Sequence, residues 1–313
     1  MGIGVTDFIA LEDVRKKFER TYPNQCSGVE SELQVEHEAY DHSLLGTAFD
    51  YVLRFWLEAK CEETYEPEPI VKRWLLPERD PDTGRLVLGS DEEYGAFTRA
   101  EKKREIFVET GGMNVTHAVD AALLFAGAQL DIEDEGSQIR KNSFEDDVVS
   151  ELQELFHLVR EQDSLIGEVA ILEPTFGSRS YILEGHGDFI VDNTLIDVKT
   201  TENTSFTPNY WRQLLAYYVL NDVHRELDGE YGSSDIPYPS LEEVGIYFAR
   251  YGELRTVEID SVIDSRDEYE RFRAWFVDRA IQENHDDRRN YEVVREILTE
   301  PYDFEEQRPL SDF

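Results

Sequence analysis

The chain has 313 residues, enough for one large domain or two modest ones with an ordinary hydrophobic core. Asp and Glu number 68 against 31 Lys and Arg, so the formal net charge is −37, yet 40% of the residues are hydrophobic. This hydrophobic content excludes a disordered acidic tail, and the length excludes a small scaffold that depends on disulfides or metals for its stability.

Lysine is scarce in this chain. It occurs eight times, which leaves 23 of the 31 basic residues as arginine. An acidic surface with little lysine is typical of a cytoplasmic protein that works in molar salt, where electrostatic screening shortens to about 3 Å. We therefore expect a halophilic, cytoplasmic protein. The alternative is an acidic protein from ordinary salt that avoids nucleic acid altogether.

The cysteine count and the apolar segments exclude further classes. Cys26 and Cys61 are too few for a four-thiolate zinc or iron–sulfur site and allow at most one disulfide. The first ten residues lack the basic and apolar regions of a signal peptide, and the longest apolar stretch, Ala121 to Leu130, is about half a membrane span. We expect a protein that has no membrane segment and stays inside the cell.

Residues 1–142 are predicted to form a mainly helical region. Apolar residues recur at helical spacing in five segments, the last of which opens the second region. Their approximate bounds are Thr6–Arg20, Leu44–Lys60, Asp91–Val108, Val115–Leu130 and Ser143–Arg160. Residues 66–90 are rich in Pro, Gly and charge, so we expect a loop there or a small hairpin around Pro81–Gly84.

Residues 143–313 change to strand periodicity after their first helix. Short runs rich in β-branched and aromatic residues predict a three-stranded meander, a helix capped by Thr207 and Pro208, and a further hairpin. The expected strands are Ile166–Phe176, Tyr181–Val191, Thr194–Thr200, Val244–Tyr251 and Leu254–Ile259. The expected helices are Asn209–Asp222, Ser261–Glu283 and Asp287–Leu298. The element order of this second region is therefore αβββαβ, with additions.

A two-residue turn at Asp192-Asn193 would fix which residues face each other across its hairpin. Counting back from the turn, Asp188 meets Asp197, with Cβ atoms roughly 4.5–5.5 Å apart on one face. Like charges so placed repel unless a cation lies between them, and hard divalent cations favour carboxylate oxygens. The strand period of two also turns Lys199 to the same side as Asp197.

Lys199 is the only lysine between Asn142 and Phe313. In a chain that uses arginine for its surface cations, this lysine suggests a role for a compact ammonium, such as a point charge near a phosphate or an attacking water. The alternative is an ordinary cross-strand salt bridge. Two other acid-x-Lys triplets, Glu58–Lys60 and Glu101–Lys103, lie in charged helical stretches and are expected to be solvated.

Three motifs carry a family resemblance: Gly185-His186-Gly187-Asp188, Asp197-Val198-Lys199-Thr200 and Gln213-Leu214-Leu215-Ala216-Tyr217. In this order they resemble the PD-(D/E)XK nuclease superfamily, particularly its RecB-like and Cas4-like branch. The resemblance is strongest from about Ile166 to Ile259. It implies an α/β (α+β) fold with a restriction-endonuclease-like αβββαβ core and a mixed central sheet.

The resemblance also implies roles for individual residues. Asp188 and Asp197 would bind Mg²⁺ or Mn²⁺, and Lys199 would orient or help deprotonate the attacking water and offset charge on the phosphate. Gln213 and Tyr217 are four residues apart, so they share one helical face and would position the site or the substrate strand. The alternative is a helix that packs Tyr217 on the sheet and bonds Gln213 to the backbone.

A third carboxylate ligand is expected on the first strand of the meander. If the turn at Gly177 is a three-residue loop, Glu168 falls opposite Asp188 and joins the metal ligands, whereas Glu173 lies several steps too far. A two-residue loop would turn Glu168 to the other face, where it would be an exposed edge carboxylate.

A fourth ligand is expected from the helical region. Many members of this branch carry a helical G-x-x-x-H whose histidine joins the metal shell, and this chain has Asp50 in the histidine position after Gly46. Asp50 could replace the histidine as a hard-metal ligand. His117 is another candidate, and its alternative role is that of a cap or a packed residue.

The resemblance implies hydrolysis of single- or double-stranded DNA, and less readily of RNA. The implied cellular role is in repair, recombination or defence. The acidic charge opposes binding to a polyanion, so binding would depend on the metal, on arginines and on stacking aromatics. The candidates nearest the site are Arg54, Arg212, Arg250, Tyr210, Trp211, Tyr217 and Tyr218. For each arginine the alternative is a solvated or structural role.

Two cofactor classes are not expected. The cysteines of an iron–sulfur cluster are missing, and no phosphate-binding G-x-x-x-x-G-K-[ST] loop is present, so we expect no nucleotide cofactor. Two rival functions stay open. One is a non-catalytic nuclease-like scaffold with Asp188, Asp197 and Lys199 as an ion-pair network, and the other is a phosphoesterase for small molecules. The helical first half could recognise DNA, a partner or a second copy in a homodimer, or simply cover the sheet.

Overall fold

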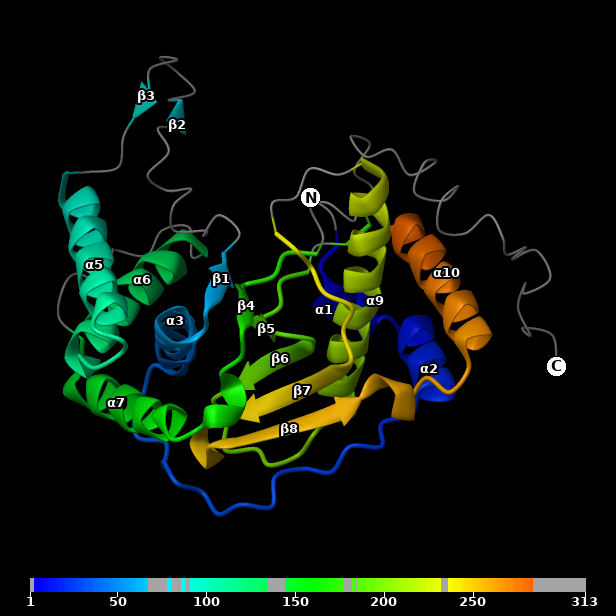
Figure 1. Cartoon of the computed structure of the whole chain (residues 1–313), viewed down its shortest axis with the longest axis horizontal. Coiled ribbons are helices and arrows are strands. Elements are labelled where there is room, and N and C mark those ends of the chain that lie inside the picture. The colour runs from blue at the N-terminus through cyan, green and yellow to red at the C-terminus, as the bar shows by residue number, and fades with distance from the viewer. Residues whose placement is uncertain are drawn as a thin grey trace.

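The structure is a computed structural model that describes residues 3–66, 78–79, 86–87, 91–133, 144–176, 182–183, 185–231 and 236–283. A six-stranded mixed sheet with the strand order β1-β4-β5-β6-β7-β8 runs through its centre, and eight α-helices in the described part surround it (Figure 1). This arrangement confirms the α+β class, the mixed central sheet and the αβββαβ order of elements from residue 146 onward.

The helices lie in the predicted segments, with three differences. The helix predicted to end at Asp222 continues to Tyr231, the helix predicted from Ser261 starts at Arg266, and the first predicted helix is divided in two. One helix was predicted up to Arg20, but α1 (Val5–Ala10) and α2 (Glu12–Thr21) are separate because Leu11 has an extended ψ of 136°. α3 (His42–Lys60) starts after Asp41, whose Oδ1 accepts a hydrogen bond from Leu44 N at 3.0 Å. The other helices are α5 (Asp91–Glu109), α6 (Val115–Glu133), α7 (Asp146–Arg160), α9 (Pro208–Tyr231) and α10 (Arg266–Glu283).

The strands lie within the predicted segments or one residue beyond them, and all but β8 are shorter than predicted. They are β4 (Val169–Leu172), β5 (Phe189–Val191), β6 (Thr194–Lys199), β7 (Glu243–Phe248) and β8 (Glu253–Glu258). The β7–β8 turn passes through Gly252, whose positive φ of 59° favours glycine. The predicted turn at Gly177 and the predicted last helix, Asp287–Leu298, lie outside the described residues.

Two short pieces of strand come from the first 142 residues. β1 (Glu63–Tyr65), which was not predicted, pairs in parallel with β4 through Glu63 and Val169, so it belongs to the central sheet. β2 (Glu78–Arg79) and β3 (Leu86–Val87) form a separate antiparallel pair, which is the small hairpin expected around Pro81–Gly84. The boundary placed at residue 142 stays a prediction, but the sheet itself takes strands from both sides of it.

Different groups of helices pack on the two faces of the sheet. Along β6, Leu195 belongs to a core built with α1, α2, α9 and α10, whereas Ile196 belongs to a core built with α3, α5, α6 and α7. Figure 1 shows these two groups of helices on either side of the strands. Because side chains alternate along a strand, Asp197 and Lys199 share the face of Leu195 and point toward α9.

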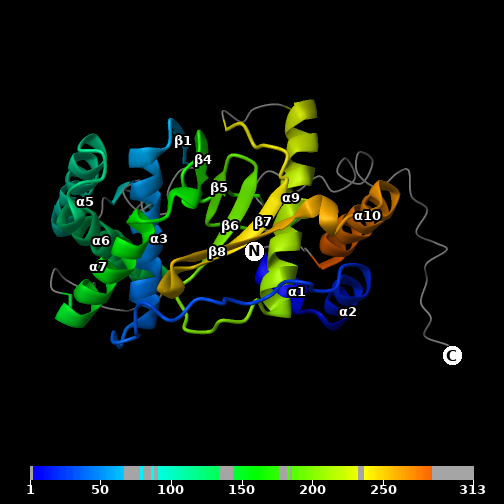
Figure 2. The same cartoon turned by 60° about the horizontal axis from the view of Figure 1, so that its bottom comes forward.

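A segment that we call the strap, residues 23–40, joins α2 to α3 without forming helix or strand. It follows the loop between β6 and α9, where Val29 N donates to Thr204 O at 2.8 Å. Glycine is required at residue 28 of the strap, because a Cβ there would lie 2.2 Å from the same carbonyl oxygen. Figure 2 shows the strap as a blue trace that passes β8 on its way to α3.

A buried ion pair ties the end of the strap to the sheet and to α7. Arg250, which follows β7, is 0% exposed and donates to Glu36 O at 3.0 Å, to Val35 O and to Thr200 O. Its guanidinium also pairs with Glu151 of α7, which is 3% exposed and accepts from Glu38 N and Ala39 N. Arg250, one of the arginines considered for nucleic-acid binding, is therefore structural.

The remaining general expectations concern cysteines and membranes. Cys26 and Cys61 are free and half-buried, so they form no disulfide. None of the helices that the structure describes combines the length and apolar content needed to cross a membrane.

Candidate active site

The β5–β6 hairpin has the predicted register. Asp192, the first residue of its two-residue turn, takes a positive φ of 50°, as the tight hairpin turns require. The paired residues are Phe189 with Ile196, Ile190 with Leu195, and Val191 with Thr194. One further step of this register brings Asp188 level with Asp197, on the face that α9 covers.

The two aspartates form an electrostatically unfavourable pair in the absence of a bound cation. Asp197 is 5% exposed, and Asp188 is half-buried with its Oδ2 accepting a hydrogen bond from Val198 N at 2.6 Å. Burial and then the charge of Asp197 raise the pKa of Asp188 well above its ordinary value. Burial also raises the pKa of Asp197, although the charge of Lys199 acts in the opposite direction.

Lys199 lies beside the aspartates, as the strand alternation predicts. Its Nζ is 2.6 Å from Oδ2 of Asp197, and it stands 4.9 Å from the ring centroid of Tyr210 in the first turn of α9. Burial alone would lower the pKa of Lys199, but the charges of Asp197 and Asp188 outweigh this effect and raise it. The lysine is therefore held as an ammonium between two carboxylates and an aromatic ring.

Asp50 reaches the same cluster from α3. The first turn of this helix passes close to the end of β6, since a Cβ on Gly46 would lie 3.4 Å from Oγ1 of Thr200. Burial raises the pKa of Asp50, and the charge of Asp197 adds to this effect, so the two carboxylates sense each other. Asp50 thus lies within electrostatic range of Asp188 and Asp197, and Lys199 pairs with Asp197.

The first strand of the meander contradicts the predicted pairing. β4 pairs with β5 through Ala170 with Val191, Ile171 with Ile190, and Leu172 with Phe189. Glu173, not Glu168, is therefore opposite Asp188, and Glu173 N donates to Asp188 O at 2.9 Å. Glu168 is exposed at the other end of the hairpin, where its N–H bonds to Asp192.

Glu173, which was predicted to lie too far along the strand, is next to the aspartates. Its backbone has a φ of 51°, which is uncommon outside glycine and marks a break at the end of β4. Its side chain is 12% exposed and pairs with Nη1 of Arg54 at 2.5 Å, while Nη2 of Arg54 pairs with Asp50. The spacing of Asp50 and Arg54, one helical turn apart, allows their pairing to be predicted from sequence. The second partner of Arg54, Glu173, is 119 positions away in sequence and could not be predicted in this way.

Gln213 and Tyr217 lie on one face of α9, as predicted, and Gln213 Nε2 donates to Tyr217 Oη at 3.1 Å. Burial raises the pKa of Tyr217 to about 12, and the charges of Asp197 and Asp188 add to the effect. Gly185 lets the loop before Asp188 approach this tyrosine, because a Cβ there would lie 3.3 Å from Tyr217 Cε1 and 2.9 Å from Val5. The motif glycine therefore serves close packing beside the site.

Most of the aromatic and basic side chains proposed for substrate contact have structural roles. Trp211 and Tyr218 are buried: Trp211 Nε1 donates to Tyr22 O at 2.9 Å, and Tyr218 packs on Tyr269. Arg212 pairs with Glu19 at 3.2 Å. His117 lies in the first turn of α6, in the helical group rather than among the carboxylates. Tyr210 and Arg54 remain as neighbours of the carboxylates.

The oxygen donors of this cluster fit Mg²⁺ or Mn²⁺, which prefer carboxylates. Oδ1 of Asp50 is buried and has no hydrogen-bond partner, so it is free to accept a cation. In the described part of the chain, no three His, Cys, Asp or Glu side chains already converge as a metal-binding group. Arg54 pairs with Oδ2 of Asp50, Lys199 pairs with Oδ2 of Asp197, and Val198 N donates to Oδ2 of Asp188.

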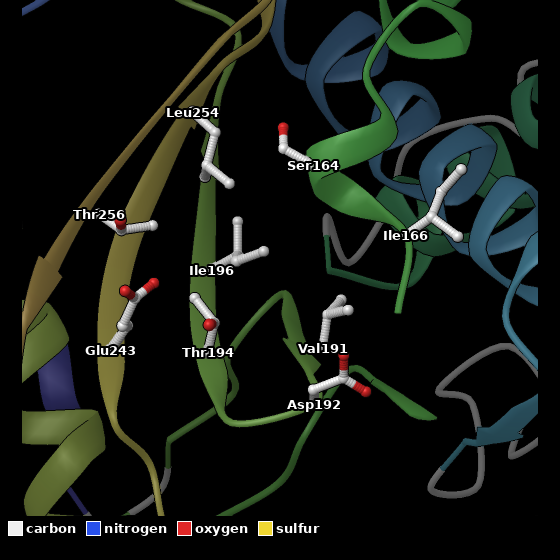
Figure 3. A pocket seen from close by; sticks show the side chains of 9 residues that line it. All are labelled: Ser164, Ile166, Val191, Asp192, Thr194, Ile196, Glu243, Leu254 and Thr256. Carbon is white, nitrogen blue, oxygen red and sulfur yellow. The ribbon is translucent and has the colours of Figure 1, made fainter. Parts of the chain in front are cut away.

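A separate cavity of about 340 Å³ lies on the opposite face of the sheet (Figure 3). Val191 and Ile196, which line it, belong to the core on the α3 side, so the sheet separates this cavity from Asp197. Its other lining residues are Ser164, Ile166, Asp192, Thr194, Glu243, Leu254 and Thr256. None of the residues predicted for catalysis or metal binding lines it.

No family model, no curated protein and no solved structure matches this chain. The family resemblance of its motifs therefore stays a prediction from sequence.

Proposed function

We propose that the chain is a metal-dependent nuclease that hydrolyses phosphodiester bonds in DNA, and less readily in RNA, within the cytoplasm of a halophilic cell. The observation that carries this proposal is the juxtaposition of Asp188 and Asp197 with Lys199 on one buried sheet face. Two aspartates placed opposite each other are costly to a fold unless they serve a cation, and an ammonium beside them suits a phosphate substrate.

The residues divide the work according to their positions. Asp188 and Asp197, with Asp50 and Glu173 at their side, would hold Mg²⁺ or Mn²⁺, which when bound polarises a phosphodiester and lowers the pKa of a water ligand. Lys199 can direct its ammonium to a phosphate oxygen or to the attacking water. Gln213 and Tyr217 fix the α9 side of the site, and Tyr210 offers a half-buried ring beside Lys199 for stacking.

The test is cleavage of linear single-stranded and duplex DNA, and of RNA, in molar KCl with Mg²⁺ or Mn²⁺. We expect metal-dependent loss of substrate with the wild-type protein and none with Lys199→Ala or Asp197→Ala. Equal degradation by all three proteins would point to a contaminating enzyme and overturn the assignment. A small phosphodiester such as bis-p-nitrophenyl phosphate, cleaved in place of nucleic acid, would favour the phosphoesterase alternative.

A non-catalytic scaffold is the second candidate, and one observation favours it. Three carboxylates of the cluster, Asp50, Glu173 and Asp197, are already paired with Arg54 or Lys199, so the site can exist as an internal ion-pair network. Calorimetric titration with Mn²⁺ separates the two functions, because a nuclease has a stoichiometric site and a scaffold has none.

A further inference from the structure

Arg54 is a buried cation placed between two carboxylates of the candidate metal site. Only 6% of its side chain is exposed, and its two terminal nitrogens pair with different acids, Nη2 with Asp50 and Nη1 with Glu173. Asp50 comes from α3 and Glu173 from the end of β4, so a single guanidinium joins a helix to the sheet. Bidentate bridging of this kind uses the planar fork that arginine has and lysine lacks.

The charges of the cluster explain why such a cation is needed. Asp50 lies within electrostatic reach of Glu173, Asp188 and Asp197, and Arg54 and Lys199 are the cations in contact with these carboxylates among the described residues. Removing one of these cations leaves a large excess of negative charge in the cluster. This excess destabilises the fold, because a buried carboxylate without a counter-ion is costly.

The guanidinium of Arg54 has one further contact, whereas its Nε is buried without a hydrogen-bond partner. Its central carbon lies 4.8 Å from the ring centroid of Tyr51, the neighbour on α3, in a cation–π contact. Even so, Arg54 leaves the site incompletely satisfied, because Oδ1 of Asp50 is buried without a hydrogen-bond partner. An additional or stronger cation would therefore find an accepting oxygen beside Arg54.

We propose that Arg54 is a competing cation built into the metal site. In the metal-free protein it holds Asp50 and Glu173, and a divalent cation that binds these two carboxylates competes with its fork for them. Arg54 thereby preserves the metal-free fold and lowers the affinity for metal. This inference rests on the proposed function, since it requires that the carboxylate cluster binds a divalent cation.

Titration calorimetry with Mn²⁺ tests the inference on the full chain, without any activity assay. The variant is Arg54→Gln, and the control is Arg104→Gln, which removes a half-buried arginine paired with Glu58 in the helical group. We expect Arg54→Gln to bind Mn²⁺ at least about tenfold more tightly than the wild type, with a lower Tm in the metal-free state. Arg104→Gln should bind Mn²⁺ with the wild-type Kd.

The possible results separate the two proposals. If the wild type binds Mn²⁺ and Arg54→Gln binds it equally or more weakly, the inference fails and the proposed function survives. If neither protein binds Mn²⁺, both fail. Should Arg54→Gln be unfolded without metal, Mn²⁺ is expected to restore its structure, and failure to do so would refute the inference. Arg54→Lys, which keeps one charge but cannot bridge both acids, is expected to tighten Mn²⁺ binding by a smaller factor.

Discussion

Glu173 and Asp188 are direct neighbours across the β4–β5 hairpin, with Glu173 N donating to Asp188 O at 2.9 Å. This contact places a fourth acidic residue at the edge of the aspartate pair. Glu173 therefore replaces Glu168 as the expected third ligand, because Glu168 lies at the far end of the same hairpin.

The first prediction compares these two glutamates. Glu173→Gln should weaken Mn²⁺ binding by about 10- to 100-fold, because it removes a carboxylate that is next to the ligands. Glu168→Gln should leave the Kd for Mn²⁺ unchanged. Titration calorimetry measures both, and a loss of affinity in Glu168→Gln alone would show that the pairing described here is not the functional one.

The second prediction concerns Lys199. Lys199→Ala should lower the cleavage rate by about 100-fold or more, because the ammonium beside the carboxylates is lost, while Mn²⁺ should bind at least as tightly as before. Lys199→Arg should not restore the rate, since the guanidinium is larger and planar. The control is Lys60→Ala, which removes an exposed lysine of another acid-x-Lys triplet that lies over Trp56. A normal rate in Lys199→Ala would remove this lysine from the mechanism.

The third prediction concerns the buried ion pair of Glu151 and Arg250. Glu151→Ala should lower the free energy of unfolding by about 3–5 kcal/mol, because it leaves the fully buried guanidinium of Arg250 without its counter-ion. Urea unfolding in molar KCl measures this loss. Glu154→Ala, at an exposed position of the same helix, should change the free energy of unfolding by no more than about 0.5 kcal/mol. Similar values for the two variants would contradict the role assigned to this pair.

The fourth prediction is the pH dependence of the same residue. Burial alone would raise the pKa of Glu151, but hydrogen bonds from Ala39 N, Arg250 and His37 outweigh burial and lower it below 4.5. A carboxyl whose pKa is lower in the folded state stabilises the fold above its unfolded pKa, and this stabilisation is lost as the pH falls below 4.5. The Tm of the wild type should therefore fall more steeply than that of Glu151→Gln between about pH 5 and pH 3. Parallel curves would contradict the lowered pKa.

The centre of the site could be predicted because local rules determine it. A two-residue turn and a period of two are enough to place Asp188, Asp197 and Lys199 on one face, and the structure has this register. The cap of α9 is equally local, since Thr207 Oγ1 accepts a hydrogen bond from Tyr210 N. These features require no knowledge of the rest of the chain.

The features that were missed depend on distant partners or on unusual backbone. The pairing of Glu173 follows from its left-handed backbone and from a bridge between Thr175 and His186, neither of which composition reveals. β1 is only three residues long and is a strand because β4 lies beside it. Helical spacing indicates the pair of Arg54 with Asp50. It cannot indicate the pair with Glu173, which is far away in sequence.

The strap has a consequence for how molecules of this chain meet each other. β8 is the outer strand of the sheet, and Ser31 N of the strap donates to Glu253 at 3.1 Å while Glu30 pairs with Arg255 at 3.6 Å. An uncovered outer strand offers its backbone to strands of other molecules, and in molar salt repulsion between acidic surfaces reaches only about 3 Å. Because the strap lies along β8, we expect it to block the addition of a strand from another molecule sterically, without depending on charge repulsion. Resistance to aggregation at high salt would then depend on a segment that has no regular structure of its own.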